Sequence, residues 1–194
     1  MKIVGSDADE VERALVAGLL GCPDCGGQLR PWGSARWRVV RRRSGSERRQ
    51  PRRARCVGCA RTHVLIGADC LLRRRDLAEM IGLALAAKAA GVGHRRAAAL
   101  AGVPVSTARG WLRRFASKAE QVRVWFTVLA HGLDPMLAAV VPTGTAFGDA
   151  VEAIGVAARA ASLRLCPVLP WSFASAATGG RLLSNTGWPY PAAV

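Results

Sequence analysis

The sequence predicts a mainly α-helical protein with one small β-rich module near its N-terminus. From residue 73 onward, apolar residues recur at helical spacing, as Leu77, Ile81 and Leu85 do. Residues 22–72 instead hold short β-like runs, over residues 36–40, 55–57 and 62–66, and two Cys-x-x-Cys pairs, with little apolar content of their own. We therefore expect four parts, with boundaries as follows: an N-terminal helix over residues 1–20, the β-rich module over 21–72, a helical domain over 73–131, and a C-terminal helix with an irregular tail over 132–194.

The charge balance indicates an anionic partner. The chain of 194 residues has 28 Lys and Arg against 13 Asp and Glu, a net charge of +15. Such an excess repels itself in a compact state unless an anion neutralises it, and nucleic acid is the usual partner. A GC-rich genome would also enrich Arg and Ala, but it would not make the arginines cluster.

The cysteines are interpreted from the compartment that the sequence suggests. The N-terminus is acidic and lacks a long apolar core, so no secretory signal is visible. No stretch reaches the roughly 18 apolar residues that a membrane helix needs. We therefore expect a cytoplasmic, nucleoid-associated protein without a membrane partner. Thiols stay reduced in that compartment, so the six cysteines are metal ligands or core residues in preference to disulfides.

The first periodic segment is short. Val11, Leu15 and Leu19 follow one another at helical spacing, and Gly21 ends the run. Ser6 is the expected N-cap, with acids in the first turn where they favour the helix dipole.

The strongest chemical signal is the set of paired cysteines Cys22, Cys25, Cys56 and Cys59. Two residues between cysteines let both thiolates meet one ion at about 2.3 Å with tetrahedral angles. Room for a hairpin between the pairs gives the layout of a zinc ribbon. Four sulfur ligands leave no open position, so the predicted Zn²⁺ is structural. An iron–sulfur or redox site is the alternative.

Three further residues could in principle bind a metal: His63, Cys70 and Cys166. His63 lies close enough to Cys59 to replace a cysteine, but a histidine on a ribbon strand is the preferred interpretation. Cys70 and Cys166 have no nearby partner in the sequence, so we expect both to be buried as small apolar side chains.

Between the two cysteine pairs lies a run from Arg36 to Arg55 with ten arginines and one acid, Glu47. We expect a loop with a flexible tip at residues 44–46 that binds phosphates without regard to sequence; a merely solvated loop is the alternative. Trp32 and Trp37 are expected to form the small core of the ribbon, with stacking on bases as the alternative. The predicted phosphate contacts are Arg41, Arg42, Arg43, Arg48, Arg49, Arg52 and Arg53.

The helical domain contains a helix-turn-helix pattern. We expect helices from Asp76 to the Gly91-Val-Gly93 stop, over residues 94–101, and from Val105 to about Ala130 with one break; Gly102 to Pro104 forms the tight turn. The last helix has an inward stripe made of Ala108, Trp111, Leu112 and Phe115.

The polar face of that helix points to DNA. Ser106, Arg109 and Arg113 stand opposite the apolar stripe, and Arg can take both acceptors of a guanine edge. We expect a recognition helix around residues 105–117 in the major groove. A solvated helical hairpin is the alternative, but such a face would usually mix charges. The predicted DNA contacts of this domain are Arg95, Arg96, Ser106, Arg109, Arg113 and Arg114.

Beyond Gly132, one more amphipathic helix is expected over residues 147–165. The tail from Cys166 carries four prolines, and we expect it to be mostly irregular.

These parts, in this order, resemble a known family. The motifs are the ribbon, the bridge Cys59-Ala-Arg-Thr-His63-Val-Leu, the basic element Arg73-Arg-Arg75, and the helical segments Ala89-Ala-Gly-Val-Gly-His-Arg-Arg96 and Ser106-Thr-Ala-Arg-Gly-Trp-Leu-Arg-Arg-Phe115. Over residues 20–120 the chain resembles an actinobacterial domain family of unknown function with a zinc ribbon and a helix-turn-helix. It is similar in layout to the N-terminal DNA-binding region of insertion-sequence transposases. The resemblance implies a transposase or other mobile-element protein as a partner.

Together, these patterns predict a non-catalytic, sequence-specific protein that binds double-stranded DNA. The expected fold is mainly α with a small β zinc ribbon, followed by a helix-turn-helix three-helix domain and a C-terminal helix. A compact transposase or nuclease is one alternative, with Asp149 and Glu152 among its few acids after residue 115. An RNA-binding zinc-ribbon protein and a protein-interaction adaptor are the others.

Overall fold

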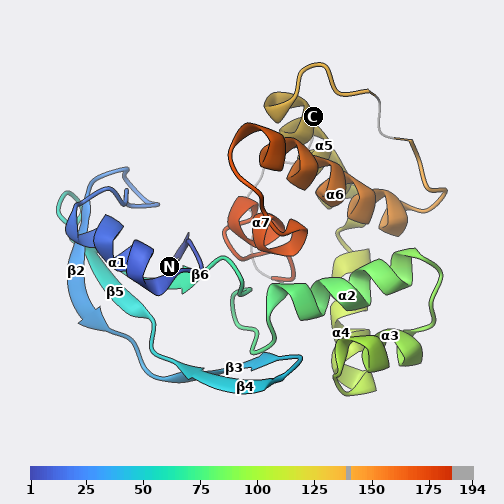
Figure 1. Cartoon of the computed structure of the whole chain (residues 1–194), viewed down its shortest axis with the longest axis horizontal. Coiled ribbons are helices and arrows are strands. Elements are labelled where there is room, and N and C mark those ends of the chain that lie inside the picture. The colour runs from blue at the N-terminus through green and yellow to red at the C-terminus, as the bar shows by residue number, and fades with distance from the viewer. Residues whose placement is uncertain (139–140, 185–194) are drawn as a thin grey trace.

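The computed structural model describes residues 1–138 and 141–184. The chain is a mixed α/β protein in which helix predominates, at 46% against 19% strand. Two lobes lie side by side (Figure 1): a ribbon lobe that holds the strands, and a helical lobe that follows it in the sequence.

The ribbon lobe is built on a four-stranded sheet in the order β1-β6-β5-β2. Its strands are β1 (Lys2–Val4), β2 (Leu29–Ser34), β5 (Arg52–Cys56) and β6 (Thr62–Gly67). β1 pairs with β6 in parallel, and the other pairs are antiparallel.

Helix α1 (Ala8–Val16) lies inside the curve of the ribbon (Figure 1). Its buried Val11 and Leu15 join Leu29, Ala54 and Leu65 in a small core. Asp7 caps this helix, because its carboxylate accepts the N–H groups of residues 9 and 10. The prediction of Ser6 as the cap was therefore wrong by one residue.

The arginine-rich insert forms a second hairpin from β3 (Arg38–Arg42) and β4 (Gly45–Arg49). β3 overlaps the β-like run expected over residues 36–40, whereas β4 lies in the part that was expected to be a loop. β3 also bonds to the segment before the helical lobe: the Arg41 N–H donates to the Arg75 carbonyl at 2.6 Å, and the Leu77 N–H donates to the Arg41 carbonyl at 3.1 Å. The Arg41 guanidinium meets the buried Asp76 carboxylate at 2.9 Å. The hairpin is thus anchored to the helical lobe.

The helical lobe comprises α2 (Ala78–Ala89), α3 (His94–Ala101), α4 (Val105–Ala116), α5 (Ala119–Leu133), α6 (Ala146–Arg164) and α7 (Pro170–Ala177). Helices α5 and α6 pack along each other, and α2 contacts α3, α4, α6 and α7. One apolar core runs through the lobe, from Leu71 to Leu183. The expected stops are confirmed: α2 and α3 end just before Gly91 and Gly102, whose positive φ values of 80° and 66° suit glycine.

Helix α7 corrects the prediction of an irregular tail. Pro170 occupies its first turn, where a missing N–H costs nothing. Its Trp171 is buried against α2. The same region ties the lobes together, because Ser175 Oγ donates to the Cys70 carbonyl at 2.6 Å and the Leu72 N–H donates to the Gly180 carbonyl at 2.9 Å. The tail prolines at positions 189 and 191 lie outside the described residues.

Candidate metal centre and basic surfaces

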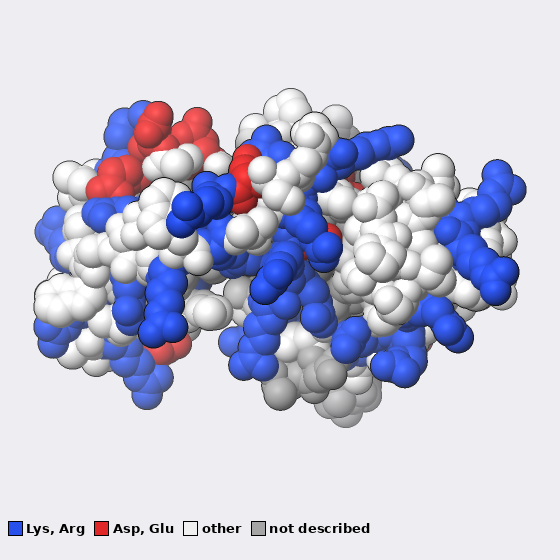
Figure 2. All heavy atoms as spheres, turned by 90° about the horizontal axis from the view of Figure 1, so that it is seen from below, with Lys and Arg blue, Asp and Glu red and all other residues white. Residues whose placement is uncertain are grey.

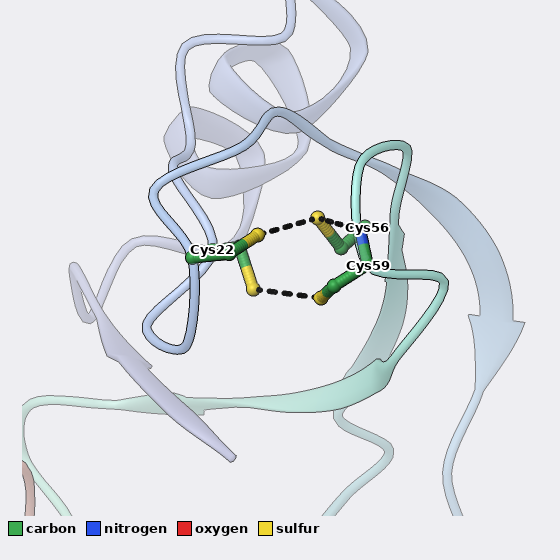
Figure 3. A group of neighbouring side chains, drawn as sticks. Cys22, Cys56 and Cys59 are labelled. Atoms are coloured by element: carbon green, nitrogen blue, oxygen red, sulfur yellow. Dashed lines mark hydrogen bonds between the residues drawn. The ribbon is translucent and has the colours of Figure 1, made fainter.

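The four predicted ligands come together in the ribbon lobe; Figure 3 labels Cys22, Cys56 and Cys59, and Cys25 completes the group. Cys22 Sγ lies 3.8 Å from Cys59 Sγ, and Cys25 Sγ lies 3.4 Å from Cys56 Sγ; all four sulfurs are within 4.8 Å of one another. A tetrahedron of sulfurs at 2.3 Å from its centre has edges of about 3.8 Å. The cysteines are not in disulfides, so the thiols are free and their spacing fits one tetrahedral ion.

Both cysteine pairs adopt the same local turn. The Gly26 N–H donates to the Cys22 carbonyl at 2.9 Å, and the Ala60 N–H donates to the Cys56 carbonyl at 3.1 Å. The first sulfur of each pair also accepts a backbone N–H at 3.4 Å, from Asp24 in one turn and from Cys59 in the other. Such N–H donors stabilise thiolates, the form in which cysteine binds metals.

A glycine lets the two turns approach each other. A Cβ on Gly27 would lie 3.1 Å from Cys56 Sγ and 3.3 Å from Cys25 Sγ. These are tight contacts with two of the four sulfurs, so a side chain at this position would crowd the candidate metal site.

The pKa values of two of the thiols are shifted in opposite directions. The Cys59 N–H, with further donors nearby, lowers the pKa of Cys56 to about 7. At Cys25 the Gly27 N–H also favours the thiolate, but contacts with the Cys56 and Cys59 thiols outweigh it and raise its pKa to about 12. Four sulfurs this close ionise together only when positive charge lies between them, which a divalent metal supplies.

His63 also lies at this centre, although it is not among the four predicted ligands. It lies in strand β6, the context that the sequence favoured, and is buried. Its Nε2 atom is 3.4 Å from Cys22 Sγ and 4.0 Å from an Asp24 carboxylate oxygen. Cys22, Asp24 and His63 therefore form a second group of potential ligands that shares one sulfur with the first. The position of His63 only four residues after Cys59 in the sequence indicated that its side chain could lie close to the cysteine cluster.

The other two cysteines differ from each other. Cys70 is buried, as predicted, and desolvation raises the pKa of its thiol to about 11. Cys166 is exposed, because it lies in the connection between α6 and α7, so the expectation that it would be buried was wrong.

The predicted outward face of α4 is exposed. Ser106, Arg109 and Arg113 are accessible, whereas the apolar stripe of Ala108, Trp111, Leu112 and Phe115 is buried. The other three predicted contacts differ in exposure. Arg95 and Arg96 are exposed on α3, whereas Arg114 is half-buried and donates to the Gly110 carbonyl at 3.0 Å.

The basic segment before α2 lies near α4. Burial, and then the positive charge of Arg114, lower the pKa of Arg74. Arg74 also accepts, through its carbonyl, a hydrogen bond of 2.7 Å from the Arg38 side chain in β3. This segment therefore contacts β3 and lies near Arg114 of α4, and Figure 2 shows basic side chains along the whole length of one face of the molecule.

The seven predicted phosphate contacts of the insert fall into two groups. Arg41, Arg42, Arg49 and Arg52 are ion-paired, with Asp76, Glu47, Glu47 and Asp69, and Glu12 in that order. These charges are already balanced within the fold. Arg43, Arg48 and Arg53 are exposed, and no ion pair involves them in the described part of the chain.

The two ribbon tryptophans do not form its core. Trp32 and Trp37 are 53% and 55% exposed, because the core of this lobe lies on the α1 side of the strands. Each ring carries an arginine instead: Arg55 lies 4.8 Å from the centre of the Trp32 ring, and Arg48 lies 5.1 Å from that of Trp37.

The two acids considered for a nuclease are engaged separately. Asp149 accepts from the Thr143 hydroxyl and N–H, and Glu152 pairs with Arg159 at 2.9 Å. Within the described residues, clusters of three or more potential metal ligands occur only at the cysteine centre.

None of the helices described has both the length and the apolarity that crossing a membrane requires. No family model, curated protein or solved structure matches this chain.

Proposed function

We propose that this protein binds double-stranded DNA sequence-specifically, and that a structural Zn²⁺ at Cys22, Cys25, Cys56 and Cys59 holds its ribbon lobe. The observation that carries the DNA proposal is α4, whose exposed Ser106, Arg109 and Arg113 stand opposite a buried apolar stripe. A helix held in this way can enter the major groove and direct its side chains to base edges.

The surroundings of α4 favour this assignment. Helix α3 packs against α4, and the two are joined by a short turn that begins at Gly102. This is the arrangement of elements expected of a helix-turn-helix, with α4 as the recognition helix. From residue 95 to residue 118 the charged side chains are all basic, which suits a polyanion.

The zinc proposal depends on the sulfur geometry. Four thiols at the edge length of a tetrahedral site suit Zn²⁺, and a site closed by four sulfurs serves folding, since it leaves no position for a reacting water. The resemblance to the DNA-binding regions of insertion-sequence transposases supports the same function, and it alone suggests a transposase or other mobile-element protein as a partner.

The test is selection of binding sites from random DNA duplexes, with the zinc content measured on the same preparation. We expect one enriched motif and one zinc per chain. Arg109→Ala should weaken binding to that motif by about 1–3 kcal/mol and relax the preference at one base pair. The matched control is Arg164→Ala, which removes an exposed arginine at the other end of the helical lobe.

The control should leave the base preference unchanged. If Arg109→Ala changes the preference at no base pair, α4 is not the recognition helix. If structured RNA displaces the selected duplex at fixed salt, the partner is RNA instead.

A further inference from the structure

The exposed side of the ribbon combines arginine side chains with two tryptophans. Successive side chains of a strand point to opposite faces, so the burial of Leu29, Ala54 and Val40 marks one face as internal. Seven exposed side chains of the opposite side are here called the outer ribbon face: Arg30, Trp32, Trp37, Val39, Arg48, Arg53 and Arg55.

The two tryptophans of this face are held in the same way. Arg30 pairs with Arg55 across β2 and β5, which sets Arg55 diagonally beside Trp32. Val39 pairs with Arg48 across β3 and β4, which sets Arg48 diagonally beside Trp37. In both cases the guanidinium lies over the ring, within the range of a cation–π contact.

The exposure of the rings shows that one side of each remains accessible. Both indoles are just over half exposed although an arginine lies against them. Tryptophan is usually well buried on average, so two such rings on one face of a small lobe are unusual for a purely structural role. They offer two flat aromatic surfaces, with Trp32 in the β2–β5 pair and Trp37 directly before β3 of the β3–β4 pair.

The charge of the outer ribbon face selects the kind of partner. Its charged residues are four arginines, and none of its seven members is an acid. The acids of the lobe that form ion pairs with the hairpin and β5 do so with arginines outside this face, as Glu12 does with Arg52 and Glu47 does with Arg49. A partner that matches the face must therefore combine flat aromatic groups with negative charge.

We propose that the outer ribbon face binds single-stranded nucleic acid. Unpaired bases stack on the open sides of Trp32 and Trp37, and the neighbouring guanidinium groups of Arg48, Arg53 and Arg55 contact the phosphates. Bases inside a duplex cannot reach the rings, because their faces are covered by the neighbouring base pairs. This site is separate from α4 and does not depend on the proposed duplex function.

The test uses the full-length, zinc-loaded protein and fluorescently labelled oligo(dT) and oligo(U), with binding followed by anisotropy. The double variant Trp32→Ala/Trp37→Ala should bind at least tenfold more weakly, because it removes both aromatic surfaces on which bases stack. The matched variant Trp32→Phe/Trp37→Phe keeps two aromatic rings and should retain most of the affinity. Comparison of the two oligonucleotides identifies DNA or RNA as the preferred strand.

Two readouts separate this proposal from the others. Circular dichroism and zinc content should be unchanged in both double variants, because the two side chains are exposed. Affinity for the selected duplex should also be unchanged by the tryptophan variants, whereas Arg109→Ala should weaken it. The proposal is overturned if the wild type binds neither oligonucleotide, if the alanine variant binds as tightly as the wild type, or if the phenylalanine variant is as weak as the alanine variant.

Discussion

Glu79 is a half-buried carboxylate on α2 whose oxygen accepts the Ser172 N–H at 3.2 Å, at the beginning of α7. Burial raises its pKa above the ordinary value of 4.5, although the N–H groups of Ser172 and Trp171 act in the opposite direction. The desolvation that penalises the charge thus outweighs the hydrogen bonds that favour it.

A group with a raised pKa in the folded state makes folding pH-dependent with a definite sign. The folded protein holds the Glu79 proton longer than the unfolded chain does, so this group stabilises at low pH and loses that contribution as the pH rises through its folded pKa. We predict that Glu79→Gln, which keeps an oxygen acceptor, gains stability relative to the wild type as the pH rises from about 4.5 to 7. Melting temperatures of both proteins across this range measure it, and a constant difference would contradict the assignment.

Single side chains mark the limit of prediction from this sequence. The four cysteines could be predicted to form one cluster of potential metal ligands, because the two-residue spacing within each pair is itself typical of such a site. Trp32 and Trp37 could not be placed, since an aromatic residue in a strand belongs equally well to either face until the partner of the sheet is known. That partner is α1, which packs on the other face of the ribbon.

At the scale of elements, the packing of α7 on α2 depends on one glycine. A Cβ on Gly82 would lie 2.1–2.2 Å from three ring atoms of Trp171. Alanine normally stabilises a helix by about 1 kcal/mol relative to glycine. Here we predict the opposite sign for Gly82→Ala, a loss of about 1–3 kcal/mol, because the ring and α7 must shift.

The control is Gly155→Ala in α6. A Cβ at this position would meet only the end of the flexible Arg159 side chain, at 3.4 Å. This variant should keep or raise stability by up to about 1 kcal/mol. Chemical denaturation of the three proteins measures both effects. If Gly82→Ala is as stable as Gly155→Ala, the close packing of α7 on α2 is wrong.

Elements with long, periodic patterns were predictable, and short ones that depend on distant partners were not. The helix predicted over residues 147–165 is α6, and the stop signals around Gly91 and Gly102 are confirmed. Strand β1 has only three residues and exists because β6, about 60 residues away, pairs with it. In the hairpin, the expected β-like run over residues 36–40 overlaps β3, but β4 was expected as a loop, because none of its side chains is apolar and buried.

For the whole molecule, the two lobes should respond differently to loss of metal. The core of the ribbon lobe is small and includes Cys22 and Cys56 themselves, whereas the helical lobe has a larger core without any of the four ligands. A structural zinc contributes about 10 kcal/mol or more to such small modules. We predict that chelation unfolds the ribbon lobe and leaves α5 and α6 folded.

Hydrogen exchange followed by mass spectrometry tests this prediction. Backbone amides of residues 29–67 should lose protection on chelation, while those of residues 119–133 and 146–164 keep it. Cys59→Ser should have the same effect as the chelator. Cys166→Ser, at the exposed cysteine outside the metal centre, should have none. Equal loss of protection in both lobes would show that they fold as one cooperative unit.

The pairing of β3 with residues 75–77, together with the Arg41–Asp76 ion pair, makes the hairpin a brace between the lobes. A brace of this kind would hold α4, the proposed recognition helix, and the ribbon that carries the two tryptophans at a constant distance from each other. A nucleic acid that engages both would have to present its duplex and its unpaired stretch at one set separation. The protein would then select its sites by the distance between the duplex motif and the junction with the single-stranded stretch, as well as by the base sequence of the motif.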